Sequence, residues 1–128
     1  MNEVKVKHAQ GKFEQAITIG KHQLTADEVE SNGGNDQGVN PQEMLLASLG
    51  ACTSMTIQMY AQRKGWPVEQ VEVTLSATKD DEGYHISRNI SFGDKLDAEQ
   101  RSKLLEIANK CPVHKILSGS IKINTKEA

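Results

Sequence analysis

The chain has 128 residues, of which 25% are charged and 37% are apolar, and its formal net charge is -2. This balance is typical of one globular domain over residues 1–128 and excludes an intrinsically disordered chain. Acidic and basic residues are interspersed, so no large positive field favours binding to nucleic acid or to an anionic membrane.

The amino-terminal segment MNEVKVKHAQGKFEQ lacks the apolar stretch of a secretory signal peptide. The longest apolar run is interrupted by Ser48, Thr53, Ser54 and Gln58, so we do not expect it to span a membrane. These features predict a cytoplasmic protein. Because cytoplasmic thiols stay reduced unless they take part in catalysis, a static structural disulfide is not expected.

The first thirty residues predict three short β-strands, around residues 4–6, 13–19 and 24–29. A segment rich in glycine and asparagine follows at residues 31–41 and predicts a loop. A helix is expected directly after this loop. Asn40 suits its N-cap, Pro41 its first position, and Glu43 the capping-box position.

This helix is expected to run from Pro41 to about Arg63 and is nearly apolar on all sides. A helix of that kind must be buried all round. Its small residues at positions 47, 48, 50 and 51 permit close approach of another backbone. Complete burial is hard to arrange inside one short chain, so the pattern favours a dimer.

The second half of the chain predicts two strands, a helix and a last strand. Residues 71–76 alternate apolar and polar side chains, residues 80–83 suit a hairpin turn, and the strand returns over residues 84–92. Arg88 stands in the apolar phase of that returning strand, so we expect it to point inward. It could instead pair with an acid such as Glu72.

A second helix is expected from about Ala98, capped by Asp97 and ended by Pro112. A final strand is expected at residues 120–124, where Ile121 and Ile123 alternate with polar residues. The order βββ-α-ββ-α-β indicates an α+β fold, with antiparallel sheet around a buried helix.

The function predicted for the chain depends on its two cysteines. Cys52 lies deep in the long helix and Cys111 in the break CPVH, and neither has the spacing of a zinc site. Because free cysteine often behaves as a small buried hydrophobe, both are explained as core residues on composition alone. If the fold brings them together, a thiol-based redox enzyme is the alternative.

A reactive thiol in apolar surroundings needs a positive or hydrogen-bonding partner. Candidates are Arg88 and the bases Lys110, Lys115 and His114 beside Cys111, although Cys111 is expected near a helix C-terminus, whose dipole opposes a thiolate. Glu43 precedes Cys52 by nine residues, so on one regular helix the two point to opposite sides. Its capping position explains Glu43 without any catalytic role.

Two segments resemble the OsmC/Ohr superfamily. NPQEMLLASLGACTSMTIQMYAQRKG, residues 40–65, is similar to the central helix of that family, and LDAEQRSKLLEIANKCPVHKIL, residues 96–117, to its second helix with a Cys-Pro-Val break. Both cysteines are in register with those of the family. The resemblance implies an intertwined homodimer with its sites at the subunit interface.

The resemblance also implies a chemistry, the reduction of organic hydroperoxides. Cys52 would attack the peroxide and become a sulfenic acid, Cys111 would resolve it as an intramolecular disulfide, and an external dithiol would reduce that disulfide. Glu43 matches the glutamate of the family, which helps to orient its arginine and the peroxide. The implied reaction needs no cofactor and no metal.

One feature departs from the family pattern. Its peroxidases carry an arginine in the amino-terminal strands, whereas residues 1–62 of this chain contain none. Lysine lacks the planar fork of a guanidinium, so Arg88 is the candidate replacement. A non-enzymatic dimer that binds a small hydrophobic ligand is the alternative function. Metal binding by Cys52, Cys111 and His114 is a weak third possibility.

Overall fold

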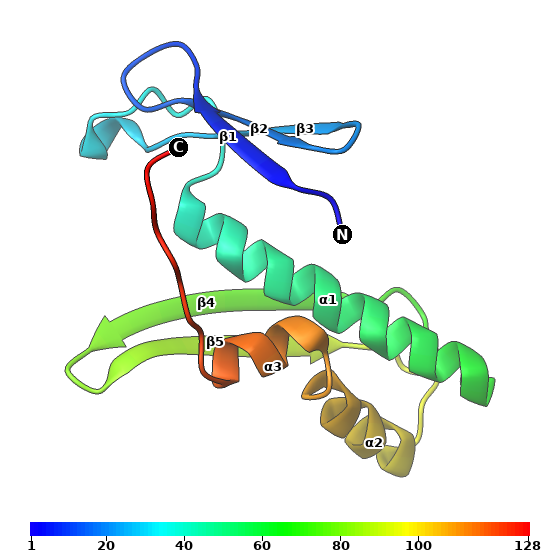
Figure 1. The fold of residues 1–128 in the computed structure, drawn as a ribbon. Helices are drawn as coiled ribbons and strands as arrows, with labels where there is room; N and C mark the ends of the chain where they lie inside the picture. The colour runs from blue at the N-terminus through cyan, green and yellow to red at the C-terminus, as the bar shows by residue number, and fades with distance from the viewer. The chain divides into compact units, whose positions relative to one another are not determined.

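The computed structural model describes residues 1–128, which form two compact units, Met1–Leu45 and Leu46–Ala128. The first unit contains a three-stranded antiparallel sheet in the order β1-β2-β3 (Figure 1). Its strands are β1 (Val4–His8), β2 (Gln15–Ile19) and β3 (His22–Ala26). The three predicted strands are therefore confirmed, with the third beginning and ending earlier than expected.

The predicted loop after β3 is organised by one buried carboxylate. Asp27 is only 2% exposed, and its oxygens accept the backbone N–H groups of Glu28 (2.8 Å), Asn35 (3.3 Å) and Gln37 (3.1 Å). A Cβ on Gly34 would lie 2.0 Å from the carbonyl oxygen of Glu28, so this position requires glycine. A short 3-10 helix, η1 (Glu30–Asn32), forms part of the same loop.

The long helix α1 (Pro41–Lys64) begins and ends where the sequence predicts. The side chain of Asn40 accepts the Glu43 N–H at 2.9 Å, and the Glu43 carboxylate accepts the Asn40 N–H at 3.1 Å, which completes the capping box. Gly65, with φ of 67°, ends the helix in the left-handed conformation.

Burial of α1 differs from the expectation. One stripe is buried, consisting of Leu49, Gly50, Thr53, Ile57 and Ala61. Another face leaves Leu45, Met55 and Met59 exposed. The helix is thus not buried on every side within one chain, because the second unit supplies partners along only one side of it.

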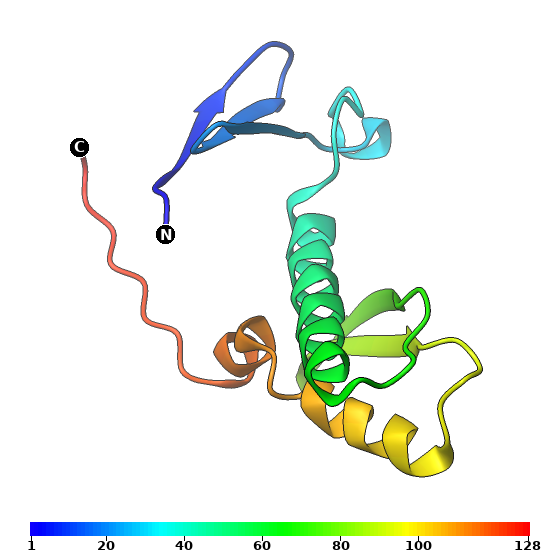
Figure 2. The same cartoon turned by 90° about the vertical axis from the view of Figure 1, so that its right-hand side faces the viewer.

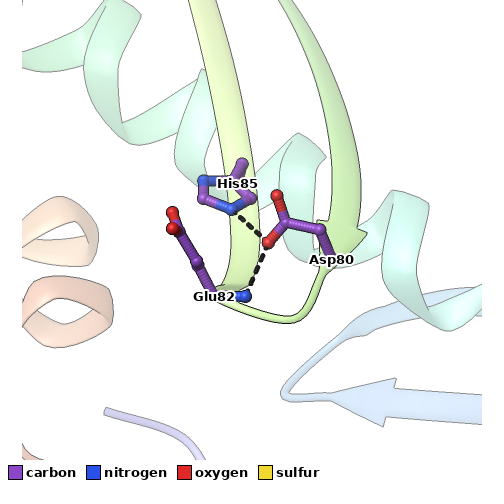
Figure 3. Close-up of polar contacts among 3 residues, drawn as sticks. All are labelled: Asp80, Glu82 and His85. Carbon is purple, nitrogen blue, oxygen red and sulfur yellow. Dashed lines mark hydrogen bonds and ion pairs between the residues drawn. The ribbon is translucent and has the colours of Figure 1, made fainter.

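In the second unit, β4 (Glu72–Asp80) and β5 (Gly83–Ser91) form an antiparallel hairpin. Figure 3 shows its turn, where the Asp80 carboxylate accepts the Glu82 N–H and lies 2.8 Å from the His85 Nε2. The hydrogen bond from His85 and the Glu82 N–H hold the pKa of Asp80 below its ordinary value. These contacts fix the turn that the sequence predicts at residues 80–83.

Two helices complete the second unit, α2 (Ala98–Ala108) and α3 (Pro112–Ser118), which lie beside α1 and the hairpin in Figures 1 and 2. Asp97 caps α2, as expected from the sequence, and also completes a capping box with Gln100. The main core joins α1, α2 and the segment after β5. It consists of Ile57, Ala61, Phe92, Leu96, Leu104 and Ala108.

The strand predicted at residues 120–124 is wrong for the single chain. Residues 119–128 form no helix or strand and are exposed throughout, and Figure 2 shows them leading away from α3. Alternation at Ile121 and Ile123 indicates a shared face, but a strand also needs a sheet edge to pair with. The remaining elements confirm an α+β fold with antiparallel sheets.

Candidate active site

The fold brings the two cysteines together. Cys52 lies on α1 and Cys111 between α2 and α3, and their side chains lie close enough for each to shift the pKa of the other. Both are free thiols; Cys111 is fully buried, whereas Cys52 is partly exposed. Their spacing in the sequence did not determine whether the two cysteines meet, because this depends on how the helices pack.

Cys111 occupies a different place from the one expected. Helix α2 ends at Ala108, and after a short turn Cys111 is the N-cap of α3, with Pro112 at the first helical position. Its sulfur accepts the backbone N–H of His114 at 3.3 Å. The expectation that a helix C-terminus opposes a thiolate here is therefore wrong, because the α3 backbone presents donors to the sulfur.

The two thiols differ in acidity. Burial raises the pKa of Cys111, but hydrogen bonds from Cys52, the His114 backbone, Thr53 and the Val113 backbone together hold this pKa below its ordinary value. Burial and the bond to Cys111 raise the pKa of Cys52. Cys111 is thus the more acidic thiol of the pair, because more donors converge on its sulfur.

Arg88 points inward from β5, as its strand phase predicts. One terminal nitrogen donates to the Thr53 hydroxyl oxygen (2.9 Å) and the Ala108 carbonyl (3.4 Å). The other donates to the Asn109 side chain (2.8 Å) and contacts the His114 Nδ1 at 3.2 Å. Arg88 therefore joins β5 to all three helices of the unit.

The alternative pairing of Arg88 with Glu72 does not form. In the β4–β5 ladder Arg88 lies opposite Leu75, and Glu72 lies opposite Ser91. Arg88 acts on the thiols indirectly, since Thr53 accepts a hydrogen bond from its guanidinium and helps to lower the pKa of Cys111. Whether it takes over the role of the amino-terminal arginine of the family stays a prediction.

His114 is held as a neutral imidazole. A guanidinium can only donate, so the His114 Nδ1 must accept the bond from Arg88 and the ring proton must sit on Nε2. Burial and the charge of Arg88 accordingly lower the pKa of His114. His114 and Cys111 do not belong to any group of three or more potential metal ligands.

Glu43 lies in the first unit, where it completes the capping box with Asn40 and is exposed. Its role in orienting a peroxide stays a prediction. Thr53 is a site residue that the sequence analysis did not single out, and the structure shows that it is fully buried. The available signal was a hydroxyl on the buried stripe of α1, adjacent in sequence to Cys52.

A pocket of about 360 Å³ opens beside Arg88. Apolar and polar groups share its walls, which are formed by Leu49, Tyr84, Ile86, Arg88, His114, Leu117 and Ser118. A larger hollow of about 660 Å³ lies between α1 and α2, but no cysteine lines it. None of the helices is long and apolar enough to cross a membrane.

A pair of neighbouring thiols, one on a long helix and one in a Cys-Pro turn, is the arrangement of a candidate thiol redox protein in this α+β fold. A sequence model of the family described as OsmC-like protein matches residues 33–126. The chain belongs to this family, and the resemblance inferred from its two helical segments is confirmed. No curated protein sequence gives a significant match.

Solved structures support the same fold. An OsmC-like protein from Mycoplasma pneumoniae is 16% identical, with 93% of this chain and 88% of that chain covered and a TM-score of 0.79. The organic hydroperoxide resistance protein OsmC from Legionella pneumophila is 20% identical, with 93% and 90% covered and a TM-score of 0.67. OhrB, the organic hydroperoxide resistance protein of Bacillus subtilis, is 22% identical, with 93% and 91% covered and a TM-score of 0.64.

Proposed function

We propose that the protein reduces organic hydroperoxides by a dithiol mechanism. The observation that carries this proposal is that the side chains of Cys52 and Cys111 lie beside each other, so that each shifts the pKa of the other. Two neighbouring thiols can form a disulfide when their side chains reach the geometry of that bond. Family membership and neighbours named for organic hydroperoxide resistance support a stress-related redox role.

Exposure supports a division of labour within the pair. Cys52 is partly exposed, so a peroxide can approach its sulfur, whereas Cys111 is fully buried behind it. The Cys52 thiolate attacks the distal oxygen of the hydroperoxide, which gives a sulfenic acid and releases the alcohol. The Cys111 sulfur then displaces hydroxide from the sulfenic acid to form the disulfide, and an external dithiol restores both thiols.

The surroundings of Cys52 favour a hydrocarbon-bearing substrate over hydrogen peroxide. Met55 and Met59 lie three and seven residues beyond Cys52, on the same face of α1, and both are exposed. We propose that this apolar face is also covered by α1 of a second copy, in a homodimer whose interface contains the site. Sedimentation equilibrium of the whole protein tests the dimer, and a monomer at micromolar concentration would contradict it.

Within each copy, we propose that residues 1–128 act as a single domain in the cytoplasm and that Glu43 and Arg88 assist the thiols. Arg88 supplies the only arginine guanidinium that contacts the residues around the pair. Thermal unfolding of the intact chain in one cooperative transition would support the single domain. Two separate transitions would show that the units fold independently.

The direct test is turnover of cumene hydroperoxide with dithiothreitol as reductant. We expect catalytic consumption of the peroxide, loss of turnover in Cys52→Ser, and accumulation of oxidised Cys52 without turnover in Cys111→Ser. A wild-type protein that consumes no hydroperoxide with dithiothreitol or dihydrolipoamide would refute the proposal. Serine is the matched replacement because it keeps the size of cysteine but not its redox chemistry.

A second function is favoured by the pocket beside Arg88, whose walls include Leu49, Ile86 and Leu117. Its volume of about 360 Å³ suits a small hydrophobic ligand, and the thiols would then be spectators or sensors. This function predicts that one equivalent of cumene hydroperoxide leaves the free thiol count unchanged. Loss of two thiols per chain would exclude the spectator role.

A further inference from the structure

Arg88 is a half-buried cation without an acidic partner. Neither ion pair of the chain includes it. The groups that its guanidinium contacts are all uncharged and belong to Thr53, Ala108, Asn109 and His114. Because a charged group that is partly withdrawn from water is normally paired with an opposite charge, the surroundings of Arg88 favour a bound anion.

One N–H group of this guanidinium is left for a ligand. The two terminal nitrogens direct their hydrogens at the four groups named above. The remaining N–H, on Nε, has no acceptor within the chain. Since no buried side-chain nitrogen lacks a hydrogen-bond partner, this Nε is accessible from outside. Arg88 lines the pocket of about 360 Å³, so a ligand there can accept from its Nε–H.

Three further donors line the same pocket. The ring proton of His114 sits on Nε2, because its Nδ1 accepts from Arg88. This Nε2–H and the hydroxyls of Tyr84 and Ser118 form no hydrogen bond within the chain. No acidic residue is among the lining residues. The polar part of the pocket therefore offers four donors and one positive charge.

The apolar part of the pocket lies on the same structural elements as its donors. Ile86 precedes Arg88 by two residues, so both project from one face of β5. Leu117 follows His114 by three residues, so both lie on one face of α3. Leu49 from α1, which is only 4% exposed, completes the apolar wall. A ligand that fits both parts combines a polar head with a short aliphatic chain.

A carboxylate is the head group that matches these donors. An ionised carboxylate only accepts hydrogen bonds, whereas an amine would bring further donors to a wall of donors. Its single negative charge also balances the single guanidinium, since His114 is neutral. A phosphate monoester carries close to two negative charges, which one cation does not balance.

From this lining we infer that the pocket binds an aliphatic monocarboxylate, with the carboxylate at Arg88 and the chain against Leu49, Ile86 and Leu117. The inference narrows the ligand of the second function above to an anion. It does not depend on the reduction of peroxides, because no thiol takes part in the binding.

Hexanoate is the probe for this site, and 1-hexanol is the uncharged control with the same chain length. Each is titrated into the fully reduced protein at pH 7 and constant ionic strength, and NMR follows the methyl groups of Leu49, Ile86 and Leu117. We expect saturable shifts at these methyl groups, with a dissociation constant about tenfold lower for hexanoate than for 1-hexanol, as expected for hydrogen bonds to a charged group.

Arg88→Met removes the charge, and Arg101→Met is its matched control. Arg101 also donates only to uncharged acceptors, the carbonyl oxygens of Leu96 (3.2 Å) and Gly93 (2.8 Å), but it does not line this pocket. We expect Arg88→Met to bind hexanoate about tenfold more weakly, no better than 1-hexanol. Arg101→Met should bind hexanoate as the wild type does.

Two exposed hydroxyls keep the test valid if Arg88→Met does not fold. The double variant Tyr84→Phe, Ser118→Ala removes both hydroxyls at exposed positions and leaves the guanidinium in place. We expect this variant to bind hexanoate about fivefold more weakly than the wild type, with no change for 1-hexanol.

Three results would overturn the inference. The first is equal affinity of the wild type for hexanoate and 1-hexanol, which would show an apolar hollow only. The second is the absence of saturable shifts at millimolar hexanoate. The third is an equal loss of affinity in Arg88→Met and Arg101→Met. Binding of hexanoate by a protein that consumes no hydroperoxide would refute the proposed function alone, whereas turnover without hexanoate binding would refute this inference alone.

Discussion

Replacement of Arg88 by methionine tests the account of the site most broadly. Methionine keeps the length of the side chain and can pack against Leu75, but it removes four hydrogen bonds, to Thr53, Ala108, Asn109 and His114. At about 1 kcal/mol for each bond, we expect the free energy of unfolding to fall by about 3 kcal/mol, somewhat less than the sum because the bond to Asn109 is exposed to water.

The assay is equilibrium unfolding in urea, monitored by the fluorescence of Trp66, the one tryptophan of the chain. The matched control is Arg63→Met, because the Arg63 guanidinium is exposed and only contacts the Tyr60 ring, at 5.9 Å from its centroid. An exposed contact of this kind contributes about 0.5–1 kcal/mol. Equal losses in the two variants would refute the role of Arg88 as the link between β5 and the helices.

The same pair of variants reports on the thiols. Without the guanidinium, Thr53 loses its charged donor, so the pKa of Cys111 should rise in Arg88→Met. Arg88→Ala should likewise raise the pKa of Cys52 more than Arg63→Ala does. Thiolate absorbance at 240 nm measures both, and unchanged titration curves would show that Arg88 is purely structural.

Three further predictions concern the scaffold. Leu104→Ala should lower the free energy of unfolding by about 2–5 kcal/mol, because this side chain is fully buried in the core. The control Leu105→Ala, at an exposed position, should lower it by less than about 1 kcal/mol. Similar urea midpoints for the two variants would contradict the core assignment. Burial raises the pKa of Asp27, but the N–H groups of Gln37, Glu28 and Asn35 lower it by more, so this pKa lies below the ordinary value of 3.8. The stability that this carboxylate contributes is therefore present above pH 3.8 and is lost as the pH falls through the lowered pKa. Amide exchange at Asn35 and Gln37 should therefore accelerate below that pH beyond the intrinsic rate, and unaltered protection at pH 2 would refute this anchor. Gly34→Ala should disrupt the same loop, since its Cβ would meet the Glu28 carbonyl at 2.0 Å; native amide shifts for residues 27–39 would contradict the required contact.

Local chemistry explains which parts of the fold the sequence predicts. Asn40 with Glu43, and Asp97 with Gln100, form capping boxes from side chains three residues apart, so both helix starts are visible in the sequence. The inward direction of Arg88 follows from strand alternation alone. Such local features can be predicted without knowledge of the tertiary contacts.

Features that depend on distant partners were not predictable in the same way. Helix α3 is short and is capped by Cys111 rather than by a usual N-cap residue, so residues 112–118 give little helical signal. The contact between Cys52 and Cys111, and the four partners of Arg88, depend on how α1, α2 and β5 pack. Residues 120–124 show the opposite failure, because a strand-like pattern finds no sheet edge in the single chain.

The central claim is that Cys52 and Cys111 form a redox pair. Treatment of the fully reduced protein with one equivalent of cumene hydroperoxide, followed by blocking of free thiols and peptide mass spectrometry without reduction, tests it most directly. The account predicts one intramolecular disulfide that joins the Cys52 and Cys111 peptides. Two blocked thiols, or a sulfinic acid on Cys52 with Cys111 still free, would contradict it.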